Sequence, residues 1–164
     1  MATLSEAIAA GALDLFEIPE WENRAPIRPL YVTQGFIDWA DGTPELHDEG
    51  LKEGGRTLFE HLEQQLTAFR CDKKIHAGDL RRMMPTKKGV WHMYPPGLRI
   101  YGWCPAKHEF VAVTGALEAD TKKPENSQLN DQKRKEVEGF IGAHRLQGTV
   151  LRGDFLAVFP NQAL

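Results

Sequence analysis

The sequence predicts an α+β fold in which helices pack against an antiparallel sheet. Three short runs rich in β-branched and aromatic residues occupy positions 90–95, 98–105 and 110–119, joined by connections of two and four residues. Parallel pairing needs a dozen or more linking residues, so these runs are expected to form an antiparallel meander. Segments with helical periodicity lie before and after the meander, and this segregation is typical of α+β domains.

Two elements are expected before the meander. Leu30-Tyr31-Val32 begins a strand, because β-branched and aromatic side chains favour extended backbone. Residues 57–70 form the clearest helix, and residues 76–89 are expected to be a short helix or turn followed by a basic loop. The apolar residues of the 57–70 helix recur at helical spacing: Leu58, Phe59, Leu62, Leu66 and Phe69.

After the meander, the spacing of apolar residues predicts a second helix over residues 130–146, whose apolar stripe contains Val137, Phe140 and Ile141. Residues 148–160 are interpreted as a final hairpin or strand. The complete prediction is an antiparallel sheet with N-terminal helices and a C-terminal helix packed on it. A length of 164 residues favours one domain. We assign that domain to residues 51–164, and residues 1–50 to an acidic N-terminal extension packed on it or preceding it.

Charge is divided unevenly along the chain, whose net charge is −3. Residues 1–69 contain thirteen acidic and four basic residues, a balance of −9, whereas residues 70–145 contain fifteen basic and nine acidic residues, a balance of +6. Such asymmetry suggests a polyanionic partner for the basic part. Two differently solvated faces of one domain would produce the same division of charge. This alternative stays open, because net charge constrains solubility more than function.

Several classes of protein are excluded or disfavoured. No apolar stretch approaches the roughly 20 residues of a membrane helix, and the N-terminal segment lacks the basic start of a secretory signal. Two cysteines are too few for a disulfide scaffold, so a cytoplasmic protein is expected. The chain has no phosphate-binding glycine motif, no nucleophile elbow and no zinc-type ligand spacing. We therefore expect neither cofactor nor metal.

A basic and aromatic constellation remains around the meander. The period of two in a strand places His92 with Tyr94, and Arg99 with Tyr101, and the PPG turn can bring the two pairs across from one another. Arginine and lysine bind phosphate, and tyrosine stacks on bases. The other basic residues of this constellation are Arg81, Arg82, Lys87, Lys88, Lys107, Lys122 and Lys123.

The same residues have the chemistry for RNA cleavage. Activating the 2′-hydroxyl against the neighbouring phosphate needs a base, a proton donor and positive charge on the phosphorane. Histidine suits either proton role near neutral pH, and arginine suits the charge role. The alternative is an ordinary sheet face, with the tyrosines in the core and Arg99 in a structural ion pair.

The segment GVWHMYPPGLRIYGWCPAKHEFVAVTGALEADTKKPE, residues 89–125, resembles the RelE/HigB-like toxins of type II toxin–antitoxin systems in the order and spacing of its elements. The likeness extends over residues 57–145 and includes the basic helix after the meander. It implies a RelE-like sheet and a metal-independent endoribonuclease that cleaves mRNA on the ribosome and is silenced by a cognate antitoxin protein.

The resemblance also implies roles for individual residues. Arg99 would contact the scissile phosphate, with His92 as base or acid and Tyr94 facing the same concave surface. The resemblance places Lys87, Lys88, Lys122 and Lys123 on the family's basic segments. With the residues of the basic and aromatic constellation, the expected RNA-binding residues are Arg81, Arg82, Lys87, Lys88, Tyr101, Lys107, Lys122 and Lys123.

Two alternatives to the enzyme stay open. The chain can be a noncatalytic module that binds nucleic acid or protein through the same sheet. It can also self-associate as a homodimer, with the acidic segment of residues 1–69 covering the basic face of its own or a neighbouring chain. No membrane partner is expected.

Overall fold

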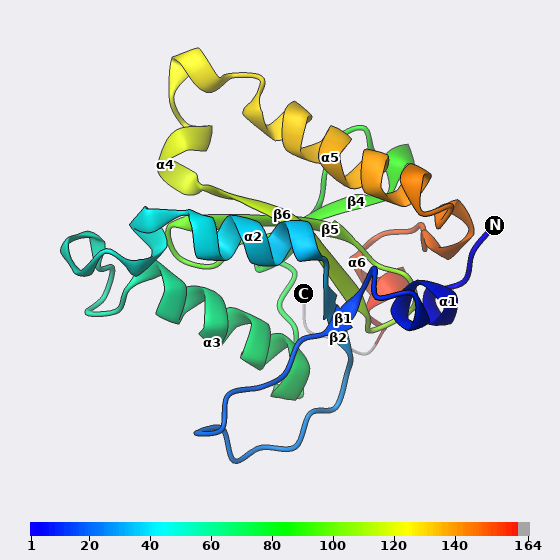
Figure 1. The fold of residues 1–164 in the computed structure, drawn as a ribbon, viewed down its shortest axis with the longest axis horizontal. Coiled ribbons are helices and arrows are strands. Elements are labelled where there is room, and N and C mark those ends of the chain that lie inside the picture. Colours follow the sequence, from blue (N-terminus) through cyan, green and yellow to red (C-terminus); the bar gives the residue numbers. More distant parts are fainter. Residues whose placement is uncertain (161–164) are drawn as a thin grey trace.

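The computed structural model describes residues 1–160 and contains a six-stranded mixed sheet with helices on both faces (Figure 1). The strands lie in the order β1-β2-β6-β5-β4-β3. Their bounds are β1 Asp14–Leu15, β2 Leu30–Val32, β3 Leu80–Arg82, β4 Val90–Met93, β5 Leu98–Trp103 and β6 Phe110–Leu117. The α-helices are α1 Leu4–Ala9, α2 Gln34–Gly42, α3 Leu58–Cys71, α4 Glu118–Thr121, α5 Leu129–Ala143 and α6 Phe155–Val158. The α+β class is therefore confirmed.

The predicted meander is present as β4, β5 and β6, paired antiparallel in sequence order. A bulge interrupts the β5–β6 ladder at Tyr101 and Gly102. At Gly102 a side chain would overlap the carbonyl oxygen of Val111 and contact the ring of Phe110. Glycine at this position therefore allows the two strands to approach closely.

The sheet is not wholly antiparallel, and this corrects the sequence prediction. Strand β2 pairs in parallel with β6, with Leu30 opposite Phe110 and Val32 opposite Ala112. Helices α2 and α3 lie between β2 and the meander in the chain, so the connection is long enough for β2 to align parallel to β6. Short β1 pairs antiparallel with the outer side of β2.

Two further segments differ from their predictions. Residues 76–89 contain the edge strand β3, which pairs antiparallel with β4, in place of a short helix or turn alone. Residues 148–160 form neither a hairpin nor a strand. Asp154 accepts a hydrogen bond from the backbone N–H of Ala157 and caps α6, whose end buries Val158 and Phe159 in the core. The strand-favouring composition of this segment is outweighed by the burial of its apolar side chains, which stabilises a short helical turn.

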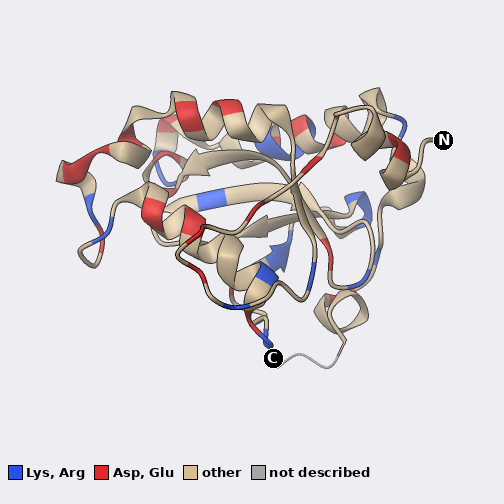
Figure 2. Cartoon of the chain, turned by 60° about the horizontal axis from the view of Figure 1, so that its bottom comes forward, with Lys and Arg blue, Asp and Glu red and all other residues tan. Residues whose placement is uncertain are grey.

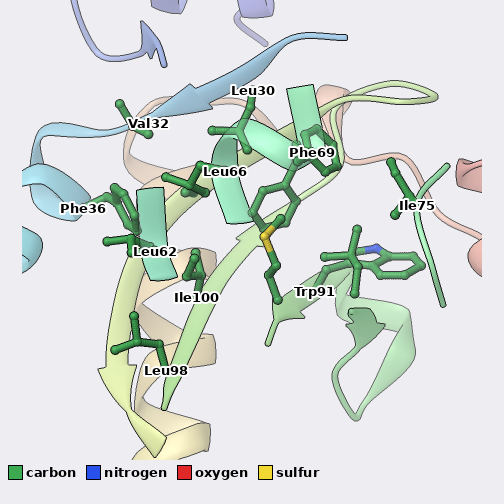
Figure 3. Close-up of a cluster of buried hydrophobic side chains, with 14 of the residues drawn as sticks. Leu30, Val32, Phe36, Leu62, Leu66, Phe69, Ile75, Trp91, Leu98 and Ile100 are labelled. Atoms are coloured by element: carbon green, nitrogen blue, oxygen red, sulfur yellow. The ribbon is translucent and has the colours of Figure 1, made fainter. Parts of the chain in front are cut away.

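Helices α3 and α5 cover opposite faces of the sheet (Figure 1). On the α3 side, the core joins Leu62, Leu66 and Phe69 to inward-facing strand residues (Figure 3). The same cluster includes Val158 of α6. On the α5 side, Val137 and Ile141 pack against Tyr101, Trp103 and other strand residues. Burial of apolar area at roughly 25 cal/mol per Å² makes these two layers the main source of stability.

Residues 1–50 contribute to the same sheet and core as the rest of the chain. Leu30 and Leu46 are fully buried in the α3-side core, and α1 packs into the α5-side core through Ala7. The boundary expected between residues 50 and 51 therefore crosses one continuous structure. Over residues 1–160, no helix combines the length and apolar character needed to cross a membrane.

Candidate functional site

The β4–β5 hairpin positions the predicted catalytic side chains. Trp91 and Met93 of β4 point into the α3-side core, so His92 and Tyr94 face the α5 side. On β5, Arg99 and Tyr101 have the same orientation, and His92 is directly opposite Tyr101 in the ladder. The sequence prediction that these pairs meet across the turn is therefore confirmed.

Two arginines lie against one tyrosine ring beside a histidine. The guanidinium carbon of Arg99 is 4.3 Å from the centre of the Tyr94 ring, and that of Arg81 is 5.1 Å from it. The rings of His92 and Tyr94 have centres 4.5 Å apart, and the Tyr94 hydroxyl lies 2.5 Å from Nε2 of His92. We call Arg81, His92, Tyr94 and Arg99 the arginine–tyrosine cluster. Cation–π attraction favours the position of each guanidinium group against the Tyr94 ring.

The imidazole of His92 is held neutral at neutral pH. Burial lowers its pKa to about 4, and the positive charges of Arg99 and Arg81 add to the effect. A neutral imidazole has one nitrogen that donates and one that accepts, and the tautomer decides which role Nε2 takes toward the Tyr94 hydroxyl. Burial also raises the pKa of Tyr94, so its phenol keeps its proton.

Tyr101 packs in the core and is not accessible to RNA. Its side chain is fully buried beneath α5, and its hydroxyl donates to Oδ1 of Asn130 over 2.5 Å. Burial raises its pKa well above the usual value. The ring packs among Trp103, Val137 and other apolar side chains, so neither ring face is open for a base to stack on.

A carboxylate from α4 neutralises part of the charge of Arg99. Glu118 Oε1 lies 3.1 Å from Nη2 of Arg99 and also accepts a hydrogen bond from the ammonium of Lys122. The hydrogen bond from Lys122, followed by the charge of Arg99, lowers the pKa of Glu118. The Arg99 side chain keeps 16% of its surface exposed, so it is accessible at the edge of the site. Its Nη1 donates to the Leu98 carbonyl at 2.7 Å.

The remaining predicted RNA-binding residues are separated. Lys87 and Lys88 precede β4, and Lys107 follows β5, at the end of the sheet where Val90 pairs with Trp103. Arg99 and the lysines after β6, Lys122 and Lys123, lie at the opposite end. Lysine and arginine segments are accordingly spread around the molecule, with acidic segments between them (Figure 2).

Three of these residues, Lys88, Lys122 and Lys123, also have carboxylate partners. Lys88 pairs with Glu138 at 3.0 Å, and Lys123 pairs with Asp120 at 2.7 Å. Arg82 is exposed and alternates with Arg81 along β3, so it faces the other side of the sheet. Among the predicted RNA-binding residues, Arg81 lies over the Tyr94 ring, and Lys122 is joined to Arg99 through Glu118.

Two polar groups near the cluster were not predicted from the sequence. Glu118 was missed, although its spacing of four residues from Lys122 is a recognisable helical pair. Lys133 of α5 donates to Oγ1 of Thr114 at 3.2 Å and pairs with Glu136, also at 3.2 Å. This lysine holds α5 against β6, and its role depends on helix–sheet packing that no local pattern reveals.

The arrangement can bind an anion next to the neutral imidazole of His92, which can accept a proton. Two guanidinium groups offer charge and hydrogen-bond donors, and His92 and Tyr94 offer a connected acceptor and donor. Among residues 1–160, histidine, cysteine and acidic side chains form no group of three placed to hold one metal ion. Comparison of the chain with family models, curated proteins and solved structures finds no match.

Proposed function

We propose that this chain binds a single-stranded RNA phosphate at the arginine–tyrosine cluster and cleaves the RNA there without a metal. The observation that carries the proposal is the stacking of Arg81 and Arg99 on one tyrosine ring, at 5.1 and 4.3 Å, beside a neutral imidazole. Clustered guanidinium groups stabilise a phosphorane, and the neutral ring can accept a proton.

The reaction needs only RNA and the side chains of the cluster. The ribose 2′-oxygen attacks the phosphorus, the bond to the 5′-oxygen breaks, and the products are a 2′,3′-cyclic phosphate and a 5′-hydroxyl. In the tautomer whose Nε2 carries the hydrogen and faces the Tyr94 oxygen, Nδ1 of His92 accepts the proton of the 2′-hydroxyl, and the phenol of Tyr94 donates its own proton to the departing oxygen. Because the phenol oxygen lies 2.5 Å from Nε2 of His92, a proton passing from His92 to Tyr94 restores both groups.

The wider proposal is a RelE/HigB-like toxin with a RelE-like sheet. Its supports are the antiparallel meander, the position of Arg99 on the central strand of that meander, and the helix α5 that follows, with Lys133, Arg134 and Lys135 in sequence. In this proposal the substrate is mRNA on the ribosome, the ribosome positions the strand, and a cognate antitoxin protein silences the activity. The protein acts in the cytoplasm.

Inducible expression of wild type beside Arg99→Ala tests the proposal. The wild type should arrest growth and produce discrete new transcript ends with 5′-hydroxyl groups, whereas Arg99→Ala should do neither while keeping the same circular dichroism spectrum. Lys107→Ala is the matched control, because Lys107 is an exposed cation at the opposite end of the sheet. Equal arrest by wild type and Arg99→Ala would remove Arg99 from the mechanism.

A second candidate is a noncatalytic RNA-binding module. The ion pair of Arg99 with Glu118 and the low pKa of His92, about 4, favour it, because a weakly basic imidazole is a poor proton acceptor. Such a module should bind single-stranded RNA with salt-dependent affinity and leave transcripts uncut.

A further inference from the structure

We infer that Glu118 is an internal competitor for the phosphate-binding guanidinium of Arg99, and that its carboxylate sets how tightly the site holds RNA. This inference rests on the proposed function and adds to it a residue that regulates the same site. Glu118 is the first residue of α4, directly after β6, and its carboxylate lies 3.1 Å from Nη2 of Arg99.

The contact occupies the group that an incoming phosphate needs. Arg99 donates through Nη1 to the Leu98 carbonyl at 2.7 Å and through Nη2 to Glu118. A phosphate oxygen approaching Nη2 therefore replaces the carboxylate or lies beside it. Since both groups are negative, a phosphate within about 5 Å of Glu118 is repelled by an energy that solvent only partly screens.

Lys122 makes displacement of the carboxylate practicable. Its ammonium already pairs with Glu118, and its own side chain is 68% exposed. When phosphate takes Arg99, Glu118 can keep Lys122 as its partner instead of losing both cations. Arg81, which approaches the same Tyr94 ring from β3, has no carboxylate partner within ion-pair distance among the described residues and can accept the phosphate first.

The test is Glu118→Gln, which keeps the size of the side chain and an oxygen that can accept from Arg99. The matched control is Asp120→Asn, which removes the same charge from the same helix but from a carboxylate that pairs with Lys123. Binding of a short fluorescent oligouridylate with 2′-O-methyl riboses, which cannot be cut, is measured by anisotropy over a range of salt concentrations.

Glu118→Gln should bind the RNA about tenfold more tightly at low salt, because an ion pair and a like-charge repulsion are both removed. Its plot of log affinity against log salt should steepen by about 0.7, the value for one added phosphate contact on a single strand. A purely structural role for Glu118 would not steepen this slope. Adding Arg99→Ala to Glu118→Gln should abolish the gain.

The outcomes separate the two proposals. Equal gains from Glu118→Gln and Asp120→Asn would reduce the effect to general charge and overturn the inference. If wild type binds through Arg99 but Glu118→Gln is no tighter, only the inference fails. If neither wild type nor Glu118→Gln binds the RNA, the proposed function and the inference fall together.

Discussion

Replacing His92 by glutamine should remove a large pH dependence of stability. The folded chain lowers the pKa of His92 from 6.5 to about 4, chiefly through burial. Between these two pH values the unfolded chain binds a proton that the folded chain does not. The free energy of unfolding therefore falls as the pH falls from about 6.5 towards 4, and this contribution is complete above 6.5.

The magnitude follows from the same two pKa values. At ~1.4 kcal/mol per pH unit, the interval from 6.5 to about 4 corresponds to about 3 kcal/mol. Urea unfolding followed by the fluorescence of buried Trp91 and Trp103 measures this quantity at a series of pH values. Wild type should lose about 3 kcal/mol more than His92→Gln between pH 7 and 4.

The control is His76→Gln, which removes an exposed histidine and leaves the His92 imidazole in place. This control should show the same His92-dependent loss of stability as wild type. Wild type and His92→Gln curves that run parallel from pH 7 to 4 would refute the reasoning, because they would mean that His92 titrates alike in the folded and unfolded chains.

Further predictions concern the packing. Gly102→Ala should cost more than about 4 kcal/mol or prevent folding, because its methyl group would overlap the Val111 carbonyl. Gly139→Ala on α5, where nothing lies within 4 Å, should raise the free energy of unfolding by about 0.5 to 1 kcal/mol, and urea titration checks both variants. Cys71 and Cys104 are buried and burial raises the pKa of each thiol, so a thiol reagent should label them only after unfolding; rapid labelling of the folded chain would contradict this burial.

Local pattern was sufficient for the central elements of the fold. The helical spacing from Leu58 to Phe69 predicted α3, and connections too short for a crossover predicted the antiparallel meander. The sequence could not reveal that β2 pairs in parallel with β6, because that choice depends on how α2 and α3 pack on the sheet. Residues 148–160 include strand-favouring residues such as Val158 and Phe159, and this composition predicts a strand or hairpin. Their helical turn depends instead on burial in a core built from distant segments of the chain.

The sequence predicted those parts of the candidate site in which the alternation of side chains along a strand determines which residues share a face of the sheet. Period two placed His92 and Tyr94 together and opposite Arg99 and Tyr101, as the ladder has them. Burial of Tyr101 under α5 was not predictable, because it requires knowing which face the helix covers. The separation of Lys87 and Lys107 from Arg99 follows from the hairpin itself, because Arg99 lies at the turn end of β5, whereas Lys87 precedes β4 and Lys107 follows β5 at the other end.

The central claim is that one RNA phosphate occupies the arginine–tyrosine cluster. The most direct measurement is an NMR titration of the His92 imidazole, with and without saturating 2′-O-methyl oligouridylate. A phosphate on Arg81 and Arg99 offsets the two positive charges that help to lower the pKa of His92, so this pKa should rise from about 4 when the RNA is bound. An unchanged His92 titration at saturating RNA would contradict the claim.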